Sequence, residues 1–437
     1  PTLLLPAQAG LGGGEGALPA PTAGAAAQAR VFDDPVSLAI VNNALVNICR
    51  EMGTAMIRTA YSPIFNESRD FSCALFDRAG QLLAQGEYCP AQLGAIVHTV
   101  RTVLDEWPIE RFAPGDVVVH NDPYRGGCHM PEHTLLAPIF VDGGLVAYAA
   151  IISHLAEIGG KVVGSFAADA TEVFQEGLRL PPVLLMRGGE RVQEVWDIIL
   201  ANHRTPRHSW GDLHAMLGAL KVADERFRAL CAKVGTEHLL AAAGALLDHA
   251  ERWMRAEIAA IPDGTYEHED TLEGDGVGTQ PIRLHVRVTV AGDRIVADYA
   301  GSADQAKGPV NATLGVTLSA TYNALYQLAD KAIPRNAGCY RPIEVRTRPG
   351  SVLDVRYPGP SVGGNTETQP RTVFLILGAL ANALPHRVSA CEGCTACNFL
   401  IGGEHPDTGE YYAHYHFEAS GWGGRAARDG KSCQKHI

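Results

Sequence analysis

The sequence predicts a fold that combines long helices with antiparallel hairpins and ends in a strand-rich second half. Apolar residues recur every three or four positions from Leu38 to Met56, and long helical patterns follow near residues 212–233 and 236–259. Residues 134–154 and 282–299 are instead β-rich runs broken by short turns containing glycine, which indicates hairpins. The chain has 437 residues, of which 46% are hydrophobic and 19% charged. That composition is typical of a globular protein, and the length is sufficient for two domains.

The first predicted helix begins at Asp34-Pro35, because aspartate caps helix N-termini and proline has no amide hydrogen to leave unpaired. Its buried stripe consists of Leu38, Val41, Leu45, Ile48, Met52 and Met56. Residues 1–33 precede it and are rich in alanine, glycine and proline. We expect them to form a flexible arm.

The next elements are two hairpins followed by two helices. The first hairpin is expected to pair residues 73–76 with 82–84, and the second to pair 134–141 with 145–154 across Asp142-Gly143-Gly144. The helices are expected near 212–233 and 236–259, and strand signals dominate from Pro262 onward. We therefore predict an N-terminal domain over residues 34–261 and a strand-rich second domain over 262–437.

The charge and cysteine content exclude several classes of protein. Lysine and arginine number 36 against 48 aspartates and glutamates, a net charge of −12 that does not favour binding to a nucleic-acid backbone. No apolar run is long enough to cross a membrane, and the N-terminus lacks the basic segment of a signal peptide. The ten cysteines are scattered, as in proteins with reduced thiols. We expect a soluble, cytoplasmic protein.

Residues 120–133 form the densest cluster of chemically active side chains. Folding the second hairpin about residues 142–144 places His154 opposite residues 131–133, so His129 and His154 should converge. Side chains that suit Zn²⁺ or Mn²⁺ near this point are His129, Glu132, His133, His154 and Glu157. The alternative is that these histidines are buried, hydrogen-bonded structural residues.

Two further segments bear on function. Cys391, Cys394 and Cys397 have CxxCxxC spacing and could hold part of a metal site with Cys433 as a fourth ligand, or could be small thiols packed under strands. Residues 424–432 resemble a phosphate-binding loop but have five residues between the glycines where four are needed. We therefore expect that the chain does not bind ATP on its own.

Taken together, five motifs resemble those of the hydantoinase B/oxoprolinase family. They are Asp70–Ala74, residues 121–129, His154 with residues 158–160, residues 175–182, and residues 421–424 with 429–430. The resemblance runs in order from about Asp34 to Cys433, which is nearly the whole ordered chain. Members usually continue past the last motif into further strands, so we expect these strands either to follow residue 437 or to belong to another chain.

The resemblance implies an α+β, multi-layered subunit with helix-flanked antiparallel or mixed sheets. It implies a divalent metal, zinc or manganese, held by Asp70, His129 and His154. Glu132 and Asp122 become candidates for contact with the substrate or with the metal ligands, and Glu132, Asp122 or His133 for proton transfer. The sequence has Leu155 where the family often has a second histidine, together with Glu157 and Glu132, which leaves the substrate open.

The resemblance also implies a partner, an ATP-binding subunit of the hydantoinase A type that phosphorylates a carbonyl oxygen, in a hetero-oligomer. The expected function is that of a metal-dependent catalytic subunit that completes the hydrolysis of a cyclic amide such as a hydantoin or a lactam. Two alternatives stay open: a subunit of an ATP-dependent ketone carboxylase of the acetone or acetophenone type, and a non-catalytic scaffold subunit of such a complex.

Overall fold

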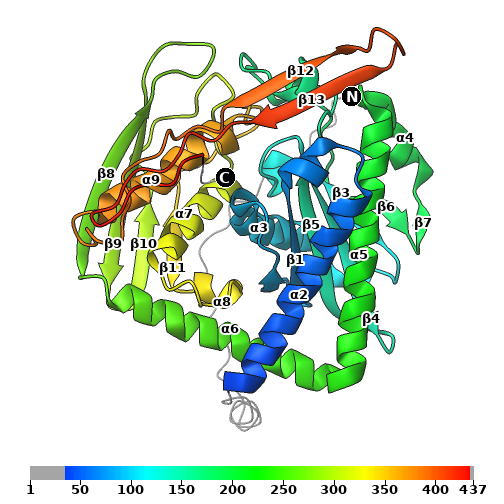
Figure 1. The fold of residues 1–437 in the computed structure, drawn as a ribbon, viewed down its shortest axis with the longest axis horizontal. Helices are drawn as coiled ribbons and strands as arrows, with labels where there is room; N and C mark the ends of the chain where they lie inside the picture. The colour runs from blue at the N-terminus through cyan, green and yellow to red at the C-terminus, as the bar shows by residue number, and fades with distance from the viewer. Residues whose placement is uncertain (1–34, 434–437) are drawn as a thin grey trace, which may run out of the picture.

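The computed structural model describes residues 35–433, so the predicted arm over residues 1–33 lies outside the described residues. The first helix is α2 (Pro35–Thr59). The six residues of the predicted apolar stripe are all buried in it, which confirms that prediction. Helix α2 lies beside α5 (Pro206–Val234), which is followed directly by α6 (Thr236–Ala259) (Figure 1). These are the helices that the periodicity predicted.

A seven-stranded antiparallel sheet forms the centre of the N-terminal half. Its spatial order is β2-β1-β5-β4-β3-β6-β7. The strands are β1 (Phe71–Asp77), β2 (Leu82–Gln85), β3 (Val117–His120), β4 (Glu132–Val141), β5 (Gly144–His154), β6 (Val183–Arg187) and β7 (Glu190–Arg191). Helices α2 and α5 cover one face, and α3 (Pro90–Glu106) covers the other. Both predicted hairpins, β1–β2 and β4–β5, are therefore confirmed.

The second half contains a four-stranded mixed sheet of order β11-β10-β9-β8. Its strands are β8 (Gly264–Leu272), β9 (Ile282–Ala291), β10 (Arg294–Asp298) and β11 (Ile343–Arg346). It packs against α7 (Leu314–Leu328) and α9 (Gln369–Leu380) (Figure 1). The fold is α+β, as expected. Helix α6 ends and β8 begins on either side of Pro262, where the sequence predicted a boundary.

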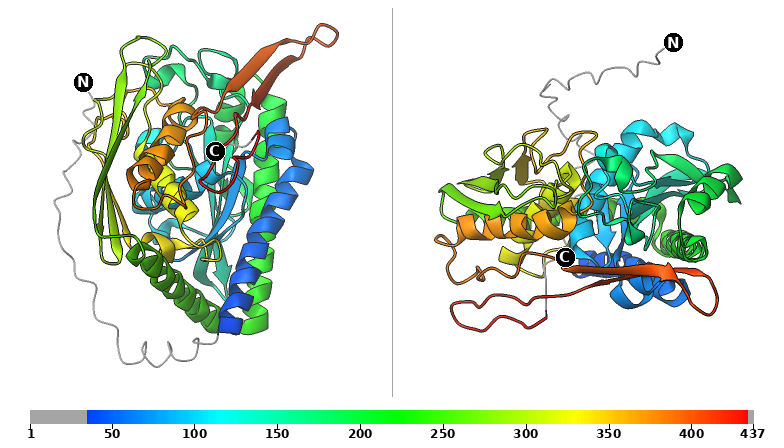
Figure 2. Two further views of the ribbon diagram at one scale, coloured as in Figure 1. Left: turned by 60° about the vertical axis from the view of Figure 1, so that its left-hand side comes forward. Right: turned by 90° about the horizontal axis from the view of Figure 1, so that it is seen from above.

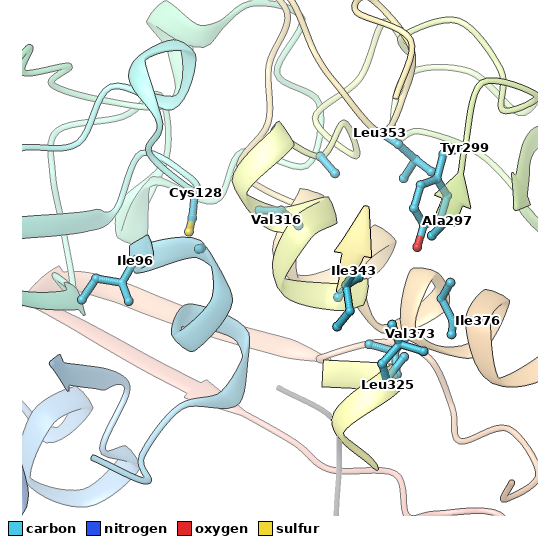
Figure 3. Close-up of a cluster of buried hydrophobic side chains, with 14 of the residues drawn as sticks. Ile96, Cys128, Ala297, Tyr299, Val316, Leu325, Ile343, Leu353, Val373 and Ile376 are labelled. Carbon is cyan, nitrogen blue, oxygen red and sulfur yellow. The ribbon is translucent and has the colours of Figure 1, made fainter. Parts of the chain in front are cut away.

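One hydrophobic core nevertheless runs through both halves. It includes Ile96 and Cys128 from the first half and Val316 and Leu353 from the second (Figure 3). Helix α3 packs directly against α7 at this junction. The two halves therefore hold each other in a fixed relation, which allows residues from both to build a single site.

The chain returns to the N-terminal half through the hairpin of β12 (Asn398–Glu404) and β13 (Tyr411–Phe417). This hairpin extends across the molecule, and its strands contact the short helices η2 (Ile64–Ser68) and η5 (Val163–Ser165) (Figures 1 and 2). The remaining short helices are η3 (Ile109–Arg111), η4 (Pro123–Arg125), η6 (Val173–Gln175), α4 (Gln193–Asn202), α8 (Ala337–Tyr340) and η7 (Gly364–Thr368).

Between residues 35 and 433, no single helix has both the length and the apolar composition that crossing a membrane requires. Helices α5 and α6 meet that test only when taken together, and they are bent by 103° with respect to each other.

Candidate active site and metal centre

Three of the predicted residues form a row across neighbouring strands of the seven-stranded sheet. Glu132 at the start of β4 pairs in register with His154 at the end of β5. The backbone N–H of His154 donates to the carbonyl oxygen of Asp70, which directly precedes β1 (3.1 Å). Since strand residues alternate between the two faces, these paired positions present their side chains to the same face, the one covered by α3.

The two carboxyl groups of this row are joined by an amide from α3. Gln92, in the first turn of that helix, donates from Nε2 to Asp70 Oδ1 and to Glu132 Oε1, both at 2.9 Å. Burial and the negative charge of Asp70 raise the pKa of Glu132 to about 8. Around neutral pH, Glu132 is therefore mostly a neutral carboxylic acid that carries a proton.

His129 reaches the same point from the loop before β4. In that loop Gly126 adopts a φ of 89°, and a Cβ on Gly127 would lie 2.8 Å from a backbone oxygen, so both positions require glycine. The Nδ1 of His129 lies 3.1 Å from the carbonyl oxygen of Val362, which can only accept, so Nδ1 carries the proton. Burial lowers the pKa of this imidazole to about 3. Its Nε2 lone pair therefore stays available, 3.7 Å from Glu132 Oε1.

His154 completes the group, with its ring centroid 5.1 Å from that of His129. Its ring stacks on Phe166 and on Tyr415 of β13, at centroid distances of 5.5 and 4.7 Å. Nδ1 of His154 lies 3.8 Å from Asp70 Oδ2. Burial and the neighbouring imidazoles hold the pKa of His154 well below its usual value, so this ring is also neutral. The predicted convergence of His129 and His154 is confirmed.

The donor chemistry of these four side chains suits a divalent metal. Within residues 35–433, the buried atoms His129 Nε2, His154 Nε2 and Glu132 Oε2 have no hydrogen-bond partner, and such groups call for a ligand, water or ion. The donors stand as two facing pairs, His129–Glu132 and His154–Asp70, separated by 3.7 and 3.8 Å. Donors around one tetrahedral zinc lie roughly 3.3 Å apart. No group of three or more His, Cys, Asp or Glu side chains in the described chain is already gathered around a metal-sized point.

The other residues proposed from the sequence lie elsewhere. Asp122 accepts from the N–H of Tyr124 and forms ion pairs with Arg179 and Arg125, at 3.5 and 3.7 Å. His133 follows Glu132 on β4 and therefore points to the opposite face. There its Nδ1 contacts the carbonyl oxygen of Pro131, and burial lowers its pKa to about 4.

Glu157, which the sequence spacing also offered as a ligand, organises a loop instead. Its carboxylate accepts from the backbone N–H groups of Gly159 and Gly164 and from Arg204 Nη1. Of the cysteine cluster, only Cys391 and Cys394 meet, with their sulfur atoms 2.8 Å apart. No metal-binding group that includes them is formed by the described residues.

Comparison with known proteins identifies the chain at the level of the family. The hydantoinase B/oxoprolinase family model matches residues 34–437. The chain belongs to the hydantoinase B/oxoprolinase family. Among its relatives, the caprolactamase subunit beta of Pseudomonas jessenii is 33% identical over 374 residues. These residues make up 85% of this chain and 64% of that protein, so the chain spans about two thirds of the relative's length.

Solved structures give the same family fold. The crystal structure of the ATP-dependent caprolactamase from Pseudomonas jessenii superposes with a TM-score of 0.86 at 31% identity, over 92% of this chain and 70% of that chain. A nucleotide-free acetone carboxylase superposes with a TM-score of 0.83 at 18% identity, over 91% of this chain and 55% of that chain. The second likeness concerns the fold alone.

Within this family fold, three supporting residues were not predicted from the sequence. Gln92 joins the carboxyl groups, and Tyr415 covers His154. Glu176 accepts with one oxygen, Oε1, from the N–H groups of Ser361 and Val362, at 2.6 and 2.8 Å. It thereby fixes the loop whose carbonyl orients His129. The motif over residues 175–182 was visible in the sequence, but nothing local showed what its glutamate holds.

Proposed function

We propose that this chain is the metal-dependent catalytic subunit of an ATP-dependent cyclic amide hydrolase of the hydantoinase or oxoprolinase type. Membership of the family supports this, as does the similarity to a caprolactamase subunit. The observation that carries the proposal is the pair of buried, neutral imidazoles, each of which faces a carboxyl group: His129 with Glu132, and His154 with Asp70.

Asp70, His129 and His154 would hold the metal, zinc or manganese. Neutral imidazoles and carboxylates are the ligands that these ions accept, and the Nδ1 contact of His129 with a backbone carbonyl is the usual way of orienting a metal-binding imidazole. When bound, the metal would supply Lewis acidity toward the reacting carbonyl group.

Glu132 is the proposed proton-transfer residue. When an amide ring opens, the C–N bond breaks and the nitrogen must take up a proton as it leaves. In the absence of metal, burial raises the pKa of Glu132 to about 8, which favours the protonated acid around neutral pH, and the Cys128 thiol lies beside this carboxyl group. Gln92 positions this acid through Oε1. Asp122 is held in ion pairs with Arg125 and Arg179, and His133 points to the opposite face of β4, so the proton transfer is assigned to Glu132.

The proposed partner is an ATP-binding subunit of the hydantoinase A type, in a hetero-oligomer. An unstrained amide is a poor electrophile, and phosphorylation of its oxygen activates the carbonyl carbon for the addition of water. ATP would be used by the partner, because residues 424–432 have the wrong glycine spacing for a phosphate-binding loop. This chain would then supply the buried acid and the metal ligands for ring opening.

The test is metal analysis combined with activity of the purified complex. We expect near-stoichiometric zinc or manganese in the wild type, and loss of both metal and lactam- or hydantoin-dependent ATP turnover in His129→Ala and His154→Ala. His386→Ala, at an exposed position remote in sequence from the site, serves as the matched control and should retain both. A metal-free complex with full activity would refute the proposal and favour a scaffold subunit.

A second candidate function is that of an ATP-dependent ketone carboxylase subunit, because the fold is similar to that of acetone carboxylase. The same preparation distinguishes the two reactions. ATP turnover that depends on a cyclic amide supports the hydrolase, whereas turnover that depends on a ketone together with bicarbonate supports the carboxylase and rejects ring opening.

A further inference from the structure

We propose that Cys391 and Cys394 form a reversible dithiol–disulfide couple that hydroperoxides oxidise. The two residues lie in the segment between α9 and β12, away from the row of Asp70, His154 and Glu132. Their sulfur atoms are 2.8 Å apart, so an S–S bond of about 2.05 Å needs a shift of less than about 1 Å.

The backbone is anchored between the two cysteines and directly after them, which keeps the sulfur atoms together. Gly393 N–H donates to Ser420 Oγ at 3.1 Å, between the two cysteines. After them, Thr395 Oγ1 donates to Glu367 Oε1 at 2.9 Å, and Ala396 N–H donates to the carbonyl oxygen of Thr366 at 2.8 Å. Proximity of the two thiols is therefore a property of the fold rather than of chain fluctuation.

The two thiols are unequal in the way that a redox couple requires. Cys391 is exposed and borders an open cavity of about 400 Å³, also lined by Trp422 and Lys431, which a small oxidant can enter. Cys394 is only 4% exposed. The hydrogen bond from Cys394, together with the nearby Arg371 guanidinium, lowers the pKa of the Cys391 thiol. Cys391 is thus the attacking residue and Cys394 the resolving one.

The chemistry balances with hydrogen peroxide, the simplest hydroperoxide, as oxidant. The Cys391 thiolate attacks one peroxide oxygen, the O–O bond breaks, and the sulfur becomes a sulfenic acid while hydroxide leaves and takes up a proton as water. The Cys394 thiol then attacks that sulfur, the S–O bond breaks, and a second water leaves. Two thiols lose two electrons and two protons, and the peroxide is reduced to two waters. A thiol reductant reverses the reaction.

A metal site is the competing use of these cysteines. Only two sulfur atoms meet here, and among residues 35–433 no third metal-binding side chain forms a group with them. Cys397 and Cys433 are exposed, and within residues 35–433 the sulfur–sulfur contact of this segment joins Cys391 to Cys394. The arrangement therefore favours disulfide chemistry over coordination.

The experiment treats the reduced full chain with hydrogen peroxide, blocks free thiols by alkylation and maps the modifications by mass spectrometry. Trypsin cleavage after Arg387 and Arg425 yields a peptide with Cys391, Cys394 and Cys397. We expect this peptide to lose two of its three alkylation sites, with the remaining label on Cys397, and dithiothreitol to restore all three. Cys397→Ser is the matched control and should still form the bond.

Cys391→Ser and Cys394→Ser should each abolish the bond, and the exposed Cys391 position keeps the test valid if the buried variant fails to fold. Three results would overturn the proposal. They are a bond that involves Cys397 or Cys433, oxidation of Cys391 to a sulfinic acid without any bond, and thiols that react only after a chelator releases zinc.

Discussion

A pair of buried imidazoles lies on each side of the sheet at the ends of β4 and β5, and the two pairs differ in their neighbours. On the α3 face, His129 and His154 each have a carboxyl oxygen within 4 Å. On the other face, the rings of His133 and His203 lie 6.1 Å apart, and their Nδ1 atoms contact the carbonyl oxygen of Pro131 and Ser209 Oγ. Within residues 35–433, neither imidazole of that second pair forms an ion pair with a carboxyl group, unlike His129 and His154.

Burial acts alike on both pairs, since it lowers the pKa of His129 and His203 to about 3 and that of His133 to about 4. A neutral, buried imidazole is therefore not by itself an indication of a metal centre. The carboxyl groups of Asp70 and Glu132, and the amide that joins them, are what distinguish the proposed site.

The largest expected difference in activity between the two faces appears when one imidazole is removed from each. His154→Ala should lower kcat/KM of the complex by more than about 10³-fold, because it removes a proposed metal ligand. His133→Ala should lower the free energy of unfolding, since it leaves a cavity at a buried position. At temperatures at which this variant is still folded, it should keep most of its activity. Equal losses of activity in the two variants would show that the faces do not differ in function.

The next effect concerns the loop that orients His129. Glu176→Ala removes the acceptor for the Ser361 and Val362 N–H groups, and we expect metal affinity to fall about 10- to 100-fold. Glu176→Gln keeps a carbonyl oxygen that can accept both bonds, so it should bind metal nearly as the wild type does. Titration with a metal-sensitive dye measures both variants. A glutamine variant as weak as the alanine one would mean that the charge, rather than the loop, matters.

A smaller change is expected from the amide that joins the carboxyl groups. Gln92→Leu removes a hydrogen bond that lowers the pKa of Glu132, so this pKa should rise further above 8. The alkaline limb of the pH–rate profile should move to higher pH, with a loss in kcat of roughly tenfold. A profile that keeps its shape while kcat falls would remove Glu132 from the proton-transfer role.

The smallest effect is on stability without metal. The folded pKa of Glu132 lies above its unfolded value, so its contribution is complete below about pH 4.5 and is lost as the pH rises through about 8. Glu132→Gln removes this pH-dependent loss of stability. The difference in melting temperature between the variant and the wild type should therefore shift in favour of the variant as the pH rises from 5 to 8. Thermal unfolding of the chelator-treated chain tests this. A difference that is constant with pH would contradict the raised pKa.

Much of this site followed from local rules of the sequence. The turn at residues 142–144 fixes the register of the hairpin, and the predicted meeting of His154 with residues 131–133 is confirmed by its pairing with Glu132. The same alternation places His133 on the far face, a consequence that the sequence interpretation did not draw. Asp70 as a neighbour of His154 came from the family resemblance, because its strand pairs with β5 across a long stretch of chain.

The remaining parts depend on how distant segments dock. Gln92 belongs to a helix whose position relative to the sheet is set by packing between α3 and α7. Val362 and Tyr415 come from the second half, and the contact of Val362 with His129 spans 233 residues. No periodicity or turn signal encodes such contacts, so the sequence could indicate the proposed ligands but not the residues that orient them.

The stacking of Tyr415 on His154 has a consequence for biosynthesis. Asp70, His129 and His154 leave the ribosome while the segments that cover and orient the two imidazoles have still to be translated. The proposed metal centre is therefore incomplete on the nascent polypeptide until β13 has been translated and Tyr415 has packed on His154. A stop codon ahead of this strand would leave the three side chains in place without their aromatic cover.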